Sequence, residues 1–135
     1  MIVVDDRLSL DALAGRGQWA DTEAVTTTWG FHYRLVRALT DPKRLGRLTP
    51  ANPASLIRTA VDPPSDVLVV LDPRRLTATA TGMAVRHGLN VLAAELVAAA
   101  MVHDAEVWLS EGNVGRSWGS VFAAEGLGLR VVTPA

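Results

Sequence analysis

The chain has 135 residues, of which 49% are hydrophobic, and its 13 Lys and Arg against 14 Asp and Glu give a formal net charge of -1. This length and composition allow one domain with a sizeable core, and the near-neutral charge excludes a surface that attracts nucleic acid or anionic membrane as a whole. The lack of cysteine excludes disulfides, thiolate metal ligands and cysteine nucleophiles. The start lacks the pattern of a signal peptide, and the longest apolar stretch, 91–102, contains Glu95 and is too short to span a bilayer. We therefore expect a soluble, cytoplasmic protein.

The first segment of the chain is a short strand followed by two aspartates and a helix. Residues 2–4 are a continuous β-branched and apolar run, which is typical of a strand buried on both faces of a parallel sheet. Residues 8–14 are mostly apolar and stop at Gly15, which predicts a short helix. Asp5 and Asp6 lie between the two elements and form either a turn and cap or an acidic site. We expect Asp6 to cap the helix and Asp5 to face a site.

Two further helices are predicted before the middle of the chain. Residues 26–28, three threonines, supply a helix N-cap, and aromatic and apolar residues then recur at helical spacing over 29–39. The dipeptide Asp41-Pro42 ends that helix. A basic stretch follows at 43–49, and Asn52-Pro53 is a favourable start for the next helix.

The second half of the chain alternates strands and helices. The run VLVVL at 67–71 is the second strand, and it also ends at an aspartate, Asp72. After it we expect, in chain order, a helix over 73–87 that stops at Gly88, a helix over 91–103 capped by Asn90, a strand over 106–109, a polar loop, a helix over 118–125 and a last strand over 129–132. Four short strands separated by helices predict a single α/β domain over 1–135, a three-layer sandwich with a short, mainly parallel sheet.

Polar side chains follow three of the predicted strands at the edge where sites form in parallel sheets. These are Asp5, Asp72 and the Ser110–Asn113 segment. Several carboxylates and an amide at one edge suit a hard cation such as magnesium, which can activate water toward a phosphodiester. For Asp72, which precedes a proline, a turn and cap is the favoured interpretation.

Glu95 lies in the apolar run LAAELVAAA. A carboxylate buried in such surroundings needs a cation, a hydrogen bond or a metal to offset its desolvation. The alternative is that Glu95 lies on the solvent face of a one-sided helix.

The order of these segments resembles the PIN domain, a family of compact magnesium- or manganese-dependent ribonucleases whose bacterial members include the toxins of toxin–antitoxin pairs. MIVVDDRLSLDALAG resembles the opening of the family, and YRLVRAL and RLGRLTP resemble its second helix and the basic linker that follows. The run VVLDPRRL, AVRHGLN, LAAELVAAAMVHDAEVWLS and the ending EGLGLRVV continue in family order. The resemblance spans nearly the whole chain and rests on order and spacing.

The resemblance implies a metal site at named positions. The first metal acid of the family falls on Asp5, the third on Glu95, and the fourth acidic or amide position on Asn113, with Glu111 as the other candidate. The second acid, normally a glutamate, falls on Arg34, so a cation stands where negative charge is expected. Asp6 and Glu23 are the acids that remain as substitutes.

Two hypotheses follow from the resemblance. In the first, the chain is a ribonuclease in which Asp5, Glu95 and Asn113 hold Mg or Mn, Arg34 binds the scissile phosphate, and a separate antitoxin chain is a partner. Candidates for RNA backbone contacts, or else ordinary solvated cations, are Lys43, Arg44, Arg47, Arg74, Arg75 and Arg116. In the second, the site is degenerate, Arg34 pairs with Asp5 or Glu95, no metal binds, and the protein acts through self-association, as a homodimer, or through a protein or RNA partner. The exposed side of the 29–39 helix is then the expected interface.

Overall fold

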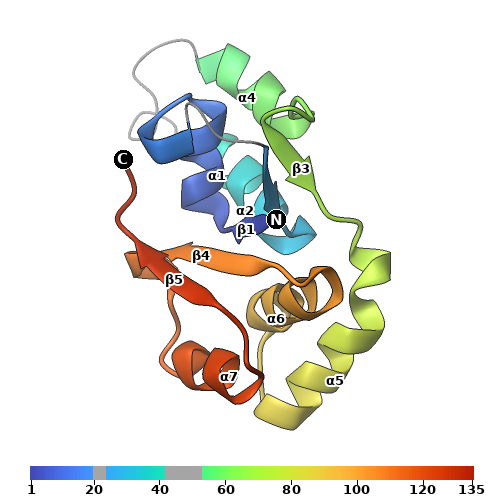
Figure 1. The fold of residues 1–135 in the computed structure, drawn as a ribbon. Coiled ribbons are helices and arrows are strands. Elements are labelled where there is room, and N and C mark those ends of the chain that lie inside the picture. Colours follow the sequence, from blue (N-terminus) through green and yellow to red (C-terminus); the bar gives the residue numbers. More distant parts are fainter. Residues whose placement is uncertain (20–23, 42–52) are drawn as a thin grey trace.

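The computed structural model describes residues 1–19, 24–41 and 53–135, and its fold is α/β (Figure 1). Within this part, five strands form one sheet in the order β3-β2-β1-β4-β5, and each neighbouring pair is parallel. The strands are β1 (Ile2–Val4), β2 (Val25–Thr27), β3 (Leu68–Val70), β4 (Glu106–Ser110) and β5 (Leu129–Val132). The predicted α/β class with a parallel sheet is confirmed.

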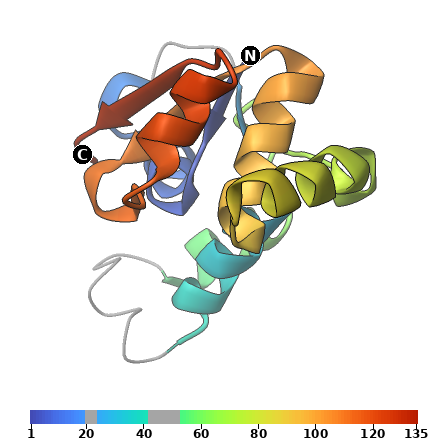
Figure 2. The ribbon, with the colours of Figure 1, turned by 90° about the horizontal axis from the view of Figure 1, so that it is seen from below.

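Helices cover both faces of the sheet. The α-helices are α1 (Asp6–Leu13), α2 (Trp29–Leu39), α4 (Pro53–Val61), α5 (Thr77–His87), α6 (Val91–His103) and α7 (Trp118–Ala124), and the 3-10 turns are η1 (Gly17–Trp19), η2 (Pro73–Arg75) and η3 (Glu111–Asn113). Val3 packs with α6 and α7, whereas its neighbour Val4 packs with α1, because successive strand residues face opposite ways. The result is a three-layer sandwich. Figure 2 shows α5 lying against α6 on the side of the molecule away from α1.

The sheet has one strand more than the four predicted. Val25–Thr27 is β2, which lies between β1 and β3, whereas the threonines were expected only as a cap. Thr28 does cap α2, since its hydroxyl accepts from Phe31 N. Thr27 uses its hydroxyl to donate to Val4 O at 2.8 Å. The strand has only three residues, all β-branched, and the capping threonine follows it directly. A pattern this short does not allow a strand to be distinguished from a cap by sequence alone.

Other element ends differ from the prediction by a few residues. The first helix begins at Asp6 instead of residue 8, and the helix expected over 73–87 is η2 followed by α5. The predicted caps Asp72 and Asn90 and the left-handed stop at Gly88 are confirmed. The basic stretch at 43–49 and Asn52 lie outside the described residues.

No single helix in the described ranges is long and apolar enough to cross a membrane. Taken together, α5 and α6 meet that test of length and composition, but they are bent by 119° relative to each other.

Candidate functional site

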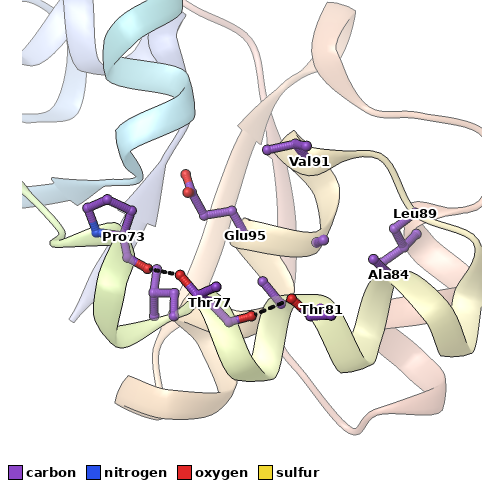
Figure 3. Close-up of a pocket in the computed structure, with 10 residues that line it drawn as sticks. Pro73, Thr77, Thr81, Ala84, Leu89, Val91 and Glu95 are labelled. Atoms are coloured by element: carbon purple, nitrogen blue, oxygen red, sulfur yellow. Dashed lines mark hydrogen bonds between the residues drawn. The ribbon is translucent and has the colours of Figure 1, made fainter.

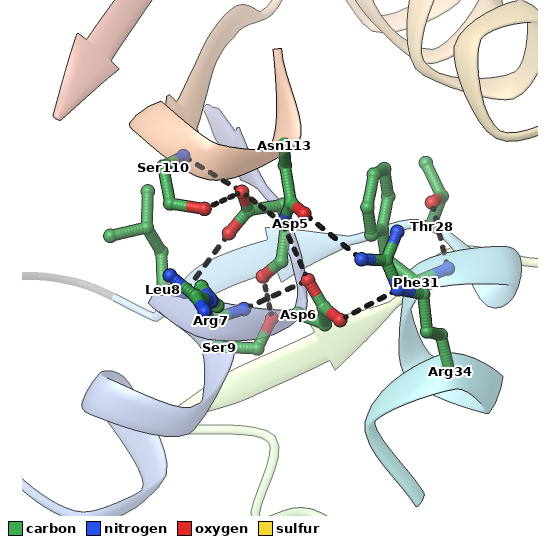
Figure 4. A network of polar contacts seen from close by, with 10 residues as sticks. All are labelled: Asp5, Asp6, Arg7, Leu8, Ser9, Thr28, Phe31, Arg34, Ser110 and Asn113. Carbon is green, nitrogen blue, oxygen red and sulfur yellow. Dashed lines mark hydrogen bonds and ion pairs between the residues drawn. The ribbon is translucent and has the colours of Figure 1, made fainter. Parts of the chain in front are cut away.

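Polar side chains gather where β1 and β4 end (Figure 4). Asp5 directly follows β1, and Ser110 is the last residue of β4, the parallel neighbour of β1. Asn113 ends the η3 turn that follows β4. Arg34 lies on α2, which is separated from the end of β2 by Thr28 alone. The parallel register therefore brings together side chains that are far apart in the sequence.

Asp5 is fully buried and accepts hydrogen bonds at both carboxylate oxygens. Its Oδ1 accepts from Leu8 N at 3.0 Å, which makes Asp5 the N-cap of α1. Its Oδ2 accepts from Ser110 N at 2.7 Å, Ser110 Oγ at 2.5 Å and Asn113 Nδ2 at 2.8 Å. The prediction that Asp6 caps this helix is wrong, because Asp5 has the extended backbone of a cap and Asp6 is already the first helical residue. Asp5 thus ties β1, α1 and β4 to one another.

Asp6 is the acid that meets the arginine. Its Oδ1 accepts from Arg7 N at 3.1 Å and from Asn113 Nδ2 at 2.8 Å, and its Oδ2 lies 3.1 Å from Arg34 Nε. Burial raises the pKa of Asp6, and the Asp5 carboxylate acts in the same direction, against the lowering effect of the Arg34 guanidinium. The balance leaves the pKa of Asp6 above its ordinary value.

Arg34 bridges two members of the cluster. Besides the ion pair with Asp6, its Nη2 donates to Asn113 Oδ1 at 3.0 Å. The expected pairing with Asp5 or Glu95 is therefore wrong. The reason is that Asp5 is already held by the backbone and by Ser110, so that Asp6 is the carboxylate left to face the guanidinium.

The amide of Asn113 has a fixed orientation in this cluster. Its Nδ2 faces the two carboxylates and its Oδ1 faces Arg34. The reverse orientation would set an oxygen against two anions and an NH2 group against a cation. The predicted neighbours Asp5 and Asn113 are thus brought together. Asp6, expected mainly as a cap, and Ser110, expected only as one of the polar residues after its strand, join them.

Glu95 takes part in a different set of contacts. It is buried on α6, and its Oε1 accepts from Gly30 N at 2.8 Å, in the first turn of α2. The alternative of a surface glutamate is therefore wrong, and a hydrogen bond is among the compensations that such a residue requires. The negative carboxylate also lies at the positive end of the α2 dipole.

The other predicted residues that the structure describes are exposed or make contacts outside the cluster. Glu111 is exposed and accepts from Thr133 Oγ1 at 2.9 Å. Arg74 pairs with Asp72 at 2.8 Å. Arg75 and Arg116 are exposed. Glu23, Lys43, Arg44 and Arg47 lie outside the described residues.

The donor set at this edge does not fit magnesium. That ion requires near-octahedral oxygen ligands, but Asp5 Oδ2 already accepts three hydrogen bonds and Asn113 turns its nitrogen to the carboxylates. A cation between Asp5 and Asp6 would need the amide oxygen there instead. In the ranges that the structure describes, no three His, Asp or Glu side chains are grouped so that they could hold a metal ion.

Comparison with known proteins adds no assignment. No protein-family model matches the chain, and no curated protein matches it.

Proposed function

We propose that this chain is a PIN-like protein in which a closed polar network replaces the metal site, and that it acts as a metal-independent binding module through self-association. The observation that supports this most is Arg34, whose guanidinium joins Asp6 to Asn113 at 3.1 and 3.0 Å. By the resemblance, this is the position of a second metal-binding acid. A guanidinium keeps its charge at every physiological pH, so it permanently supplies the positive charge that a metal would bring.

The hydrogen bonds of Asp5 point the same way. Four donors from the chain surround its carboxylate, two of them backbone N–H groups. Such groups stabilise the ionised carboxylate without any cation. Losing them to admit a metal would also uncap α1 and free Ser110, so metal binding and local folding would compete.

The first experiment measures metal binding by calorimetry. We expect no binding of Mn²⁺ or Mg²⁺ to the wild-type chain and no Mn²⁺-dependent cleavage of a labelled single-stranded RNA. Arg34→Glu removes the cation and sets a second carboxylate beside Asp6, so this variant should bind Mn²⁺ more tightly than the wild type, seen as a larger Mn²⁺-dependent gain in thermal stability. Arg34→Gln is the matched control, which removes the cation without adding an acid. Asp5→Ala is unsuitable as a test because Asp5 caps α1.

The opposite results would restore the ribonuclease hypothesis. These are micromolar Mn²⁺ binding by the wild type, together with Mn²⁺-dependent RNA cleavage that Asp6→Asn abolishes.

The outer face of α2 supports self-association. Trp29 and Tyr33 are 49% and 53% exposed, and their rings stack with centroids 5.4 Å apart. Arg37, one turn further along, is exposed as well. Large exposed aromatic groups mark interaction surfaces, and Trp, Tyr and Arg are the residues that most often dominate binding energy at such surfaces.

The spacing of this face makes it complementary to itself. Residues 29, 33 and 37 are evenly separated, so an antiparallel two-fold pairing of α2 centred on Tyr33 sets each Trp29 against Arg37 of the partner subunit. An arginine over a tryptophan ring is a favourable cation–π contact. Helix α2 contains no acidic residue, so a second copy of the helix cannot offer Arg37 an ion pair. The partner that it can offer is the ring of its Trp29.

The second experiment measures association by sedimentation velocity over a range of concentrations. We expect a reversible dimer that Trp29→Ala or Arg37→Ala weakens. The double exchange W29R/R37W should restore it, since the same pair re-forms with the partners interchanged. Val85→Ala, at a residue 83% exposed on α5, is the control and should change nothing. A wild type that stays monomeric, or an exchange that fails to restore the dimer, would refute this mode of association without affecting the metal result.

A further inference from the structure

A groove between α5 and α6 has mainly apolar walls and one buried acid (Figure 3). Its volume is about 290 Å³, and its apolar wall includes Leu76, Ala84 and Leu89. This is at the lower end of the range for ligand pockets, roughly 300–1,000 Å³, so an occupant must be small. The polar groups on the lining are Thr77, Thr81 and Glu95.

The polar groups of the groove are acceptors toward a ligand. Thr77 Oγ1 donates to Pro73 O at 2.9 Å, and Thr81 Oγ1 donates to Thr77 O at 2.8 Å. Their protons are therefore committed to the helix backbone, and each hydroxyl presents only lone pairs. The carboxylate oxygens of Glu95 are acceptors as well. A ligand that meets these groups must bring a hydrogen-bond donor.

Among the described residues, Glu95 has no cationic partner. It is only 8% exposed, and its Oε1 accepts from Gly30 N. In the described part of the chain its Oε2 makes no hydrogen bond and neither oxygen forms an ion pair. One backbone N–H satisfies a small part of the acceptor capacity of a carboxylate, so Oε2 is left to accept from a donor in the groove. The charge therefore favours a cation in the groove.

We propose that this groove binds a small molecule with a protonated primary amine on an apolar chain. The ammonium group pairs with Glu95 Oε2 and the chain packs on the wall formed by Leu76, Ala84 and Leu89. This site uses none of the residues of the Asp5–Arg34 cluster or of the α2 face, so it stands independently of the proposed function.

The test is an NMR titration of the ¹⁵N-labelled chain with n-hexylammonium, and with n-hexanol and hexanoate as matched ligands without positive charge. We expect amide shifts at Thr77, Thr81 and Glu95, and an affinity for the ammonium at least about tenfold above that for the alcohol, as for a charged hydrogen bond. Nα-acetyl-lysine amide is a further ligand. If it binds more tightly than n-hexylammonium, the natural source of the amine is a lysine side chain, and if more weakly, a free amine.

Two variants separate the carboxylate from the groove. Glu95→Gln keeps an oxygen for Gly30 N but removes the charge, and it should cost about tenfold in affinity for the ammonium. Ala84→Leu fills the groove and should abolish binding of both the ammonium and the alcohol. Glu106→Gln, at an exposed glutamate at the start of β4, is the control and should change nothing. Equal affinity for ammonium and alcohol, or an unchanged affinity in Glu95→Gln, would overturn the proposal.

Discussion

Asp5 and Asp6 are adjacent in the chain but have different partners. Asp5 accepts two backbone N–H groups, a serine hydroxyl and an amide. Asp6 has a cation beside it, yet burial and the negative charge of Asp5 outweigh that cation and raise its pKa. The ion pair with Arg34 therefore offsets part of a cost that the fold itself imposes.

The raised pKa of Asp6 predicts a specific pH dependence. As the pH rises above 3.8, the ordinary pKa of the group, the unfolded chain loses this proton before the folded chain does. Asp6 therefore lowers the stability of the folded state across the window from 3.8 up to its raised pKa. Asp6→Asn lacks this term, so its stability relative to wild type should increase with pH through that window and then stay constant.

Urea unfolding of both proteins at a series of pH values measures this difference. Any pH-independent effect of the substitution shifts the whole curve and leaves its slope unchanged. Asp66→Asn, which removes one carboxyl group at an exposed aspartate, is the matched control for the change in net charge. A difference for Asp6→Asn that falls as the pH rises would contradict the assignment.

At the scale of elements, several helix caps could be predicted from nearby residues, but contacts between residues far apart in the sequence could not. The caps at Thr28, Asp72 and Asn90 follow from residue type and spacing. The contact between Glu95 and Gly30, 65 residues apart in sequence, has no local signature. The sequence indicated that a buried Glu95 needs a partner, but that partner is a backbone N–H that any residue except proline would offer.

The junction of α2 and α6 depends on Gly30 lacking a side chain. A Cβ atom at residue 30 would lie 3.0 Å from Leu92 Cδ2 and 3.2 Å from Glu95 Oε1. Both contacts are tight, and Glu95 cannot withdraw without losing its hydrogen bond to Gly30 N. Gly30→Ala should therefore destabilise the fold by about 1 kcal/mol, the usual effect of losing a cap, although alanine is the better helix former.

The matched control for this substitution is Gly82 in α5. A Cβ atom there meets nothing within 4 Å, so Gly82→Ala should stabilise the protein by roughly 0.5–1 kcal/mol through helix propensity alone. Chemical denaturation of the two variants gives the comparison. If both substitutions stabilise the fold equally, the junction of α2 and α6 is not as close as described.

At the scale of the whole molecule, the class of fold could be predicted but the arrangement of the cluster could not. Short apolar strands between helices indicate a parallel sheet. The strand order β3-β2-β1-β4-β5 decides which strand ends are neighbours, and no local pattern encodes it. Asp5 and Asn113 are expected at one edge of the sheet because each follows a predicted parallel strand, and the family resemblance implies the same pairing. The ion pair of Asp6 with Arg34 depends on the position of α2. That position is set by strand β2, which precedes α2 and was not predicted.

Helix α5 has no buried residue and packs mainly along α6. Its C-terminal end is held by Glu125, just beyond α7, whose Oε1 lies 2.7 Å from His87 Nε2 and 3.4 Å from Arg86 Nη1. The hydrogen bond with His87 lowers the pKa of Glu125, so this contribution to stability is present at neutral pH and is lost as the pH falls below 4.5, its ordinary value.

This arrangement predicts how the molecule opens. Segments with few buried contacts open at the lowest free energy, so the amides of α5 should exchange with deuterium faster than those of α6, eight of whose residues are buried. Glu125→Gln weakens the contacts to His87 and Arg86. It should therefore speed exchange in the last turn of α5 at pH 7 while leaving the middle of α6 unchanged. Hydrogen exchange followed by mass spectrometry resolves the two helices, with Glu106→Gln as a charge-matched control. Equal protection of α5 and α6, or faster exchange in both helices of Glu125→Gln, would show that they open as one unit.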